Sequence, residues 1–257
     1  MILLQIPKLT FSMDTLIPII VAWMVMFFSA ILVLLVAKVF SFSKEITGSL
    51  MLVAILGNTS FMGIPIVNAY MGESAIPYVL VYDQLGTFIA LAIYGTFIAS
   101  YYSSKNQITF KIITLKVLTF PPFISLVAAL FLMGVEFNPI LSKVLASFSS
   151  TIVPMALVAV GLQLQFKLPK EDLKPFSIAL VIKLIIAPIF AIIICKIFSW
   201  DNEVSVVSIM ESAMAPMITA GAIASMAGLA PRLSSAIVGY GILISFITTA
   251  ILFKLIN

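Results

Sequence analysis

A run of nine residues in the first half of the chain combines helix-breaking and polar side chains inside an otherwise apolar segment. The run is Gly57-Asn58-Thr59-Ser60-Phe61-Met62-Gly63-Ile64-Pro65. Lipid offers no hydrogen bonds, so a helix broken inside a bilayer needs protein or water partners for the backbone groups it frees. Asn58, Thr59 and Ser60 supply neutral donors and acceptors suited to orienting a carboxylate. Gly57 permits the break, and Pro65 suits the first turn of a new helix, whose N-terminus attracts anions.

A second break is expected at Pro216, within an apolar segment at residues 204–227. Its neighbours are less polar, and it offers backbone groups and the hydroxyl of Thr219. Either break alone is equally compatible with a packed kink whose hydroxyls only bond freed carbonyls. Two breaks, one in each half of the chain, favour a binding site, because crossed broken helices form the sites of many secondary transporters.

Three ionisable residues, Asp83, Lys183 and Glu211, lie well inside apolar segments. A charge near the bilayer centre costs at least about 2.5–3.5 kcal/mol on insertion scales, so each needs a partner or water. Lys183 is expected to attract an anion or pair with a carboxylate, and snorkelling of its long stem is the structural alternative. Asp83 or Glu211 would carry a coupling proton, or form a permanent ion pair with Lys183 that holds helices together. Sodium coupling through unwound carbonyls with Asn58 and Asp83 is a further option.

Composition places the chain among polytopic membrane proteins of the all-α class. Hydrophobic residues make up 62% of the 257 residues and charged residues 9%, against roughly a quarter charged in soluble domains. The net charge of +4 does not indicate nucleic-acid binding, because most basic residues lie at the ends of apolar segments. The single cysteine, Cys195, excludes a disulfide within the chain, and the lack of histidine excludes histidine-based catalysis and metal ligation. We expect no catalytic residues, no metal and no cofactor beyond a proton or sodium gradient.

Eight full spans and a partial one are expected along the chain. After an apolar stub at 1–11 they lie at about 15–40, 50–71, 75–101, 117–135, 141–166, 175–198, 204–227 and 231–256. Lysine and arginine are more numerous on one side of these spans, which places that side in the cytoplasm.

The apolar segments repeat at an offset of about 156 residues. Residues 15–40 fall on 171–196, and Gly72 falls on Gly228. Repeats with an odd number of spans have opposite topology, so the pattern predicts an inverted-repeat transporter. The same alignment predicts a five-plus-five helix architecture in which the stub at 1–11 ends a helix, and the first one to two helices are missing.

These motifs resemble the auxin efflux carrier family, which includes plant auxin carriers and many bacterial permeases. The run from Gly57 to Pro65 resembles the family's fourth-helix motif. The other matching motifs are Tyr82-Asp83-Gln84-Leu85-Gly86 (fifth helix), Lys183 with Pro188 (eighth) and Ala213-Met214-Ala215-Pro216 (ninth-helix break). The plant carriers have a proline immediately before the motif asparagine, where this chain has Gly57.

The resemblance implies one membrane transport domain over residues 1–257, with scaffold helices at 117–166 and a mobile part formed by 15–101 and 172–256. It also implies elevator-type alternating access that carries a small organic anion, a carboxylate by preference. The expected surroundings are the lipid bilayer of a cell membrane, the bacterial inner membrane by analogy. No nucleic-acid partner is expected, and a homodimer is left open.

Two other functions compete with proton-coupled anion transport. One is a sodium-coupled symporter of bile-acid-carrier type, which shares the crossed architecture. The other is a non-transporting membrane protein, such as a receptor or a truncated remnant. An intramembrane enzyme is disfavoured, because the sequence places no Ser–Lys pair, paired aspartates or metal ligands at helical spacing.

Overall fold

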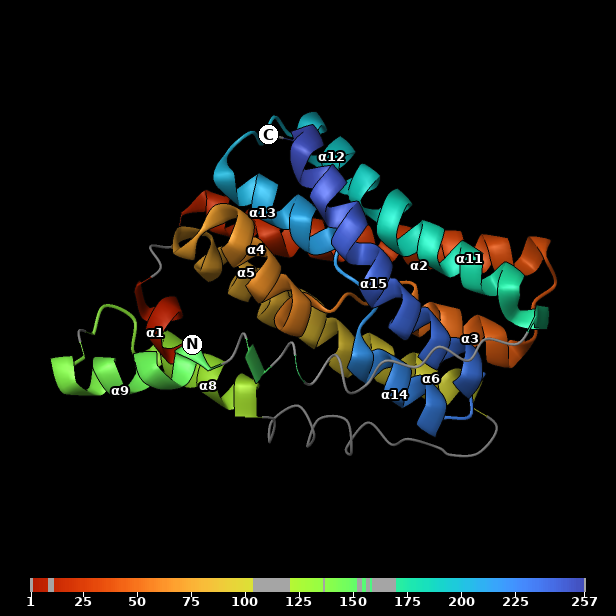
Figure 1. Cartoon of the computed structure of the whole chain (residues 1–257), viewed down its shortest axis with the longest axis horizontal. Coiled ribbons are helices and arrows are strands. Elements are labelled where there is room, and N and C mark those ends of the chain that lie inside the picture. Colours follow the sequence, from red (N-terminus) through yellow and green to blue (C-terminus); the bar gives the residue numbers. More distant parts are fainter. Residues whose placement is uncertain are drawn as a thin grey trace.

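The computed structural model of the chain describes residues 2–8, 12–103, 121–135, 137–151, 154–155, 158 and 170–256. Among these residues the regular elements are helices, and one isolated two-residue bridge is the only pairing of β type. The longer helices, shown in Figure 1, are α1 (Ile2–Gln5), α2 (Ile17–Val39), α3 (Lys44–Val53), α4 (Ile64–Met71), α5 (Ile76–Val81), α6 (Thr96–Tyr102), α8 (Pro121–Phe131), α9 (Pro139–Ser150), α11 (Leu173–Val181), α12 (Ala187–Ile197), α13 (Glu203–Ser212), α14 (Ile218–Met226) and α15 (Pro231–Ile256).

Four continuous helical stretches of the described residues are long and apolar enough to cross a membrane. They cover Met13–Val39, Glu73–Tyr102, Leu173–Ile197 and Pro231–Ile256. Each lies within about two residues of an expected span, a difference typical of helix ends. The multi-pass, all-helical class is therefore confirmed.

Both predicted helix breaks are present. α3 ends at Val53 and α4 begins at Ile64, while α13 ends at Ser212 and α14 begins at Ile218. The first break contains one wide, π-type turn, η3 (Thr59–Gly63). Three further π-type turns, η5 (Tyr82–Phe88), η6 (Leu91–Gly95) and η8 (Ile182–Ile186), interrupt otherwise continuous helices. Such turns occur often at functional sites, because they redirect side chains.

Matching backbone features recur in the two halves of the chain. Ser41 and Ser199, which follow the ends of α2 and α12, have φ of 52° and 53°. Gly72 and Gly228, which follow the ends of α4 and α14, have φ of 83° and 76°. Glycine reaches this region without steric cost, which accounts for a glycine at both places where the second part of a broken helix stops.

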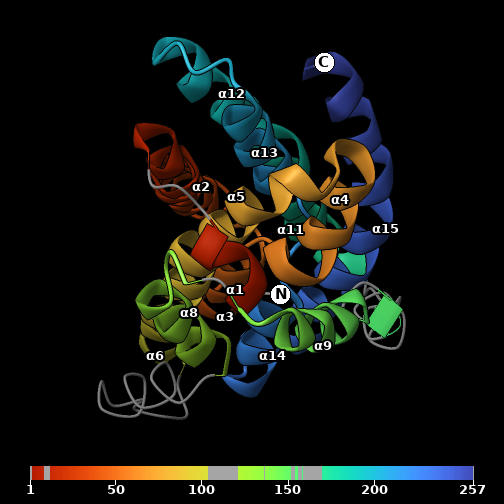
Figure 2. The same cartoon turned by 90° about the vertical axis from the view of Figure 1, so that its left-hand side faces the viewer.

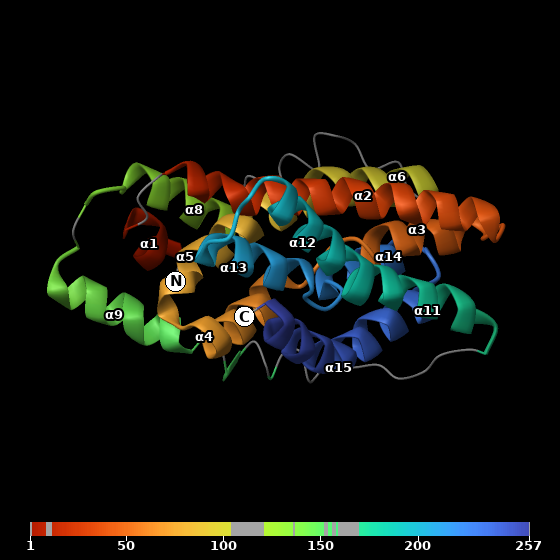
Figure 3. The same cartoon turned by 90° about the horizontal axis from the view of Figure 1, so that it is seen from above.

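The two broken helices lie inside a bundle formed by both halves. α13 packs against α2, α5 and α12, and α3 packs against α6, α14 and α15. α8 contacts α1, which also contacts α9, and Figure 2 shows these three helices together below α12 and α13. Seen from above in Figure 3, α9 lies at one end of the molecule. Residues 104–120, which include the start of the expected span at 117–135, and most of the second half of the expected span at 141–166 lie outside the described residues.

We expect Gly241→Ala to destabilise the fold where α15 meets the second break. A Cβ at Gly241 would lie 2.5 Å from Cδ of Pro216, and overpacking of this kind costs about 1–3 kcal/mol. Thermal unfolding of the purified chain in detergent should therefore shift to lower temperature. Gly95→Ala is the matched control, since its Cβ would meet only the flexible end of Leu91, at 3.3 Å, and more distant leucine methyls. An equal shift in both variants would contradict this account.

Candidate functional site

The two helix breaks bond directly to each other. The backbone N–H of Asn58 donates to the carbonyl of Ala215 at 2.7 Å, and the N–H of Met217 donates to the carbonyl of Leu56 at 2.9 Å. These bonds satisfy groups that each helix frees where it breaks, which lipid could not do. The predicted crossing of two broken segments is therefore present, and each break depends on the other.

Gly57 and Pro216 lie opposite each other at the centre of the crossing, in antiparallel orientation. A Cβ at Gly57 would lie 3.0 Å from Nζ of Lys183. The glycine thus leaves space for an ammonium group to reach the backbone at the crossing. Gly241 in turn leaves space for the ring of Pro216, because a Cβ at Gly241 would overlap that ring.

Asn58 is buried and caps the turn that follows it. Its Oδ1 accepts from the N–H of Phe61 at 3.2 Å, and its carbonyl accepts from the N–H groups of Met62 and Gly63 at 3.2 and 3.1 Å. Part of the helix N-terminus expected to attract an anion is therefore occupied by Asn58 itself. The buried Nδ2 of Asn58 has no hydrogen-bond partner in the described part of the chain, so it is a donor available to a ligand. Pro65 lies in the first turn of α4, as predicted.

Asp83 holds the first break against η5. Its Oδ1 accepts from the hydroxyls of Thr59 and Ser60 at 2.5 and 2.6 Å, and its Oδ2 accepts from Nε2 of Gln84 at 2.6 Å. Asp83 is 2% exposed, and three donors suit an ionised carboxylate. In this conformation the two hydroxyls predicted to orient a substrate are bonded to Asp83. Gln84, which sequence reasoning did not select as a site residue, completes the group.

Lys183 caps the end of α13. Its Nζ, with the side chain 2% exposed, donates to the carbonyl of Ser212 at 2.8 Å. Ser212 is the last residue of α13, where carbonyls lack helical partners and a positive charge is favourable. The permanent ion pair with Asp83 or Glu211, held as an alternative, is not formed among the described residues, and the buried side chain does not snorkel to the surface of the protein. A backbone carbonyl freed by the second break takes the place of a carboxylate.

Glu211 lies fully buried at the crossing. It is 0% exposed, and among the described residues neither of its carboxylate oxygens has a hydrogen-bond partner. Both oxygens lie against Gly63, where a Cβ would overlap them. Gly63 therefore leaves the space that this carboxyl group occupies. The position of Gly63 in the first break did not reveal this role.

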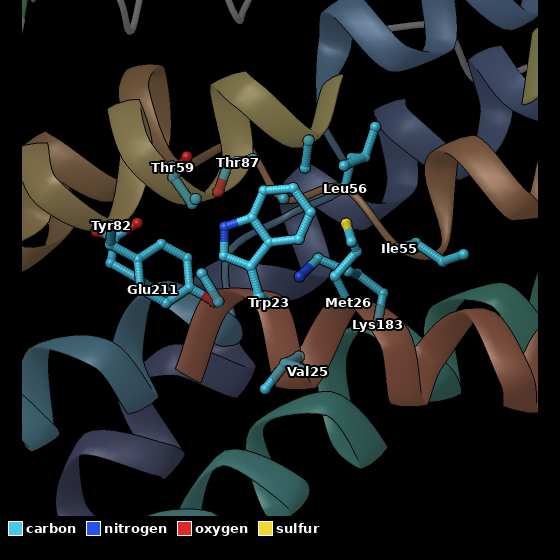
Figure 4. A pocket seen from close by; sticks show the side chains of 14 residues that line it. Trp23, Val25, Met26, Ile55, Leu56, Thr59, Tyr82, Thr87, Lys183 and Glu211 are labelled. Carbon is cyan, nitrogen blue, oxygen red and sulfur yellow. The ribbon is translucent and has the colours of Figure 1, made fainter. Parts of the chain in front are cut away.

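A small cavity lies beside these charged groups. It has a volume of about 20 Å³, and its lining includes Gly57, Thr59, Lys183 and Glu211. Figure 4 shows the two charged side chains near the ring of Trp23, which also lines the cavity. About 10–15 Å³ is needed for one water, so the cavity suits a water and is far too small for an organic anion.

A larger cavity opens farther along the first broken helix. Its volume is about 780 Å³, within the range of about 300–1,000 Å³ typical of ligand pockets. It is lined by residues of α1, α4, η4 (Glu73–Ala75) and α9, with polar groups from Gln5, Asn68, Glu73, Ser142, Lys143, Ser149 and Ser150. Sequence reasoning missed this group, because its members are far apart in the chain and follow no motif. Thr219 is exposed on α14 and lines neither cavity.

The described residues provide no group of three or more acidic or cysteine side chains that could hold a metal ion. What the crossing brings together is one satisfied carboxylate, one lysine on a helix end and one unpartnered carboxyl beside a water-sized space. Such an arrangement suits the binding of a proton or a small ion, and within the described part of the chain it shows no nucleophile with an adjacent base.

These features define a class: a polytopic helical membrane protein in which two broken helices cross at a buried charged site. The family model described as a membrane transport protein matches residues 3–253. The chain belongs to this family, the auxin efflux carrier family of membrane transporters.

Two curated relatives are themselves described as uncharacterized transporters. The protein from Methanocaldococcus jannaschii is 27% identical over 202 residues, which cover 77% of this chain and 64% of the relative. The protein from Methanothermobacter thermautotrophicus is 23% identical over 184 residues, which cover 69% of this chain and 58% of the relative. The matches thus span less than two thirds of either relative's length.

We expect Ser60→Ala to lower the stability of the purified chain by about 1–3 kcal/mol, because a buried carboxylate loses one of three donors. Ser74→Ala is the control, since the hydroxyl of Ser74 donates to Glu203 at 3.0 Å on the exposed surface, where such changes stay within about 0.5 kcal/mol. Thermal unfolding in detergent, followed by circular dichroism, compares the two. Equal shifts would show that the bond from Ser60 to Asp83 does not stabilise the crossing.

Proposed function

We propose that this chain acts as a proton-coupled secondary active transporter of a small organic anion, a carboxylate by preference. The observation that supports this most directly is the crossing itself: two broken helices bonded through Asn58 and Met217 around buried Asp83, Lys183 and Glu211. Broken helices crossed in this way form substrate and ion sites in secondary transporters. Membership of a membrane transport family is consistent with this function.

The proposed transport motion is of the elevator type. The mobile part comprises residues 15–101 and 172–256, and residues 117–166 belong to the scaffold, in a five-plus-five inverted repeat. The backbone bonds between the breaks support one moving body, because they join the two halves of the mobile part. The matching left-handed positions at Ser41 and Ser199 and at Gly72 and Gly228 support the repeat. In the described residues α9 packs mainly against α1, which suits a helix outside that body.

Coupling to protons is favoured over coupling to sodium by the partners of the charged groups. Asp83 already accepts three hydrogen bonds from neutral donors. The ammonium of Lys183 lies beside the small cavity, where a bound sodium ion would meet a like charge. The sodium-coupled symporter of bile-acid-carrier type is the competing outcome of the transport experiment below.

The substrate is proposed to enter through the larger cavity beside α4. Lys143 supplies a positive charge for a carboxylate, and Asn68 and Gln5 supply amide donors. Asn58, with its unpartnered Nδ2, is the proposed contact at the inner end of this route, reached when the crossing opens. The protein is proposed to reside in a cell membrane, with the bacterial inner membrane as the predicted type, and to be able to form a homodimer.

The transport experiment measures uptake of radiolabelled mono- and dicarboxylates into proteoliposomes that contain the chain. We expect uptake of at least one carboxylate to follow an imposed pH gradient with choline as the only other cation. Asn58→Ala should reduce that uptake about 10-fold or more, since a hydrogen bond to a charged group contributes about 1.5–3 kcal/mol. Ser177→Ala is the control, because the exposed Ser177 hydroxyl bonds only to its own helix, at the carbonyl of Leu173.

Three outcomes would contradict parts of this proposal. Uptake that depends on sodium at fixed pH would replace proton coupling by sodium coupling. Full activity of Asn58→Ala would remove Asn58 from the substrate site. No uptake of any carboxylate, by this chain or by a version extended to the length of its relatives, would favour a non-transporting membrane protein.

A further inference from the structure

The three buried ionisable groups at the crossing are unequally satisfied. Asp83 accepts three hydrogen bonds, and Lys183 donates one to the carbonyl of Ser212. Glu211 is fully buried, and it is the one of the three for which the described residues provide no hydrogen-bond partner. An ionised carboxylate in such a place is very costly, whereas the neutral acid costs far less.

The net charge of the three residues also indicates that Glu211 carries a proton. If all three residues were ionised, the crossing would carry one net negative charge in a region from which water is largely excluded. A single proton on Glu211 removes this charge and leaves Asp83 and Lys183 to balance each other. The hydrogen bonds show why the proton belongs on Glu211: Asp83 is held by donors that favour its charged form.

We propose that Glu211 is the proton-carrying residue of the transporter, and that Lys183 changes its acceptor from the Ser212 carbonyl to the Glu211 carboxylate when the proton leaves. This inference rests on the proposed function, proton-coupled transport. Ser212 directly follows Glu211 in the chain, so the two acceptors lie close to each other at the end of α13. Lys183 and Glu211 also line the same small cavity, so rotation of the long, flexible Lys183 stem is the movement that this change requires.

The change of acceptor couples the proton to the crossing. With Glu211 protonated, the ammonium caps the C-terminal end of α13 and stabilises that half-helix. With Glu211 ionised, the ammonium is drawn to the carboxylate, and the carbonyl of Ser212 loses its partner beside the bonds that join the two breaks. Proton release therefore weakens the crossing, as an opening step requires. The cavity of about 20 Å³ between these groups offers space for one water to carry the proton.

The surroundings of Glu211 support this pairing. The titratable groups that face it are Tyr82 and Asp83 of η5 and Lys183 of η8. The other charged groups on elements packed against α13 lie at the ends of those elements, namely Lys38 of α2, Lys196 of α12, Arg232 and Lys254 of α15 and Glu73 of η4. Lys183 is therefore the cation placed to pair with Glu211 when that carboxyl group is ionised.

Gly63 contributes to the same coupling between the proton and the crossing. Both carboxylate oxygens of Glu211 lie against its Cα, with no space for a Cβ. The first break thus receives the proton-carrying group of the second helix, which places the proton between the two halves of the crossing. Protonation can then be sensed by both broken helices at once.

The test uses infrared difference spectra of the purified chain in liposomes, recorded between acid and alkaline pH in choline chloride. We expect a band from a buried protonated carboxyl group in the wild type. Glu211→Gln, which keeps the size of the side chain and imitates the neutral acid, should remove the band without loss of folding. Glu171→Gln is the matched control, since Glu171 is exposed and lines neither cavity, and it should leave the band in place. In Lys183→Met the band should persist to a pH about one unit or more higher than in the wild type, because the carboxylate loses its cation.

Other results would overturn the inference. A band that survives in Glu211→Gln would place the proton elsewhere. A band that is unaffected by Lys183→Met would exclude the change of acceptor. Loss of the band on replacing choline by sodium would make the crossing a cation site. Because these readouts need no substrate, failure of carboxylate uptake would contradict the proposed function while the spectra still decide the role of Glu211.

Discussion

The structure depends on two backbone hydrogen bonds, from Asn58 to Ala215 and from Met217 to Leu56. Breaking a helix inside an apolar environment exposes N–H and carbonyl groups that cost several kcal/mol each when unpaired. Here each break supplies the partners that the other lacks, so neither could form alone. The crossing also requires Gly241, which leaves space for the ring of Pro216, and Lys183, which caps the end of α13.

Each charged group around the crossing has a different role. Asp83 is saturated by donors from its own half of the chain and holds the first break in place. Lys183 stabilises the free end of the second broken helix. Glu211 has neither a donor nor a cation at hydrogen-bond distance among the residues that the structure describes. A site in which one carboxylate is held by three donors, one ammonium caps a helix end and one carboxyl group is left without a donor is suited to the exchange of a single proton.

Two separate cavities contain the charged groups and the proposed substrate route. The cavity at the crossing holds about one water, whereas the cavity beside α4 and α9 has the volume of an organic ligand. Coupling between them would pass through the first broken helix, since η3 lies against Glu211 at Gly63 and α4 lines the larger cavity through Asn68. Transport of an anion against its gradient needs such a link between an ion site and a substrate site.

The amino-acid sequence determined the helical membrane class, both breaks and the burial of Asp83, Lys183 and Glu211, because length, hydropathy and helix-breaking residues are local properties. Several further features were decided by tertiary structure. The partner of Lys183 is a carbonyl, because the end of α13 lies nearer to it than a carboxylate does. Thr59 and Ser60 bond Asp83, and Gly63 admits Glu211, because π-type turns direct these side chains in ways that helical spacing does not predict. The larger cavity joins residues from α1, α4 and α9 that share no motif, so only packing could bring them together.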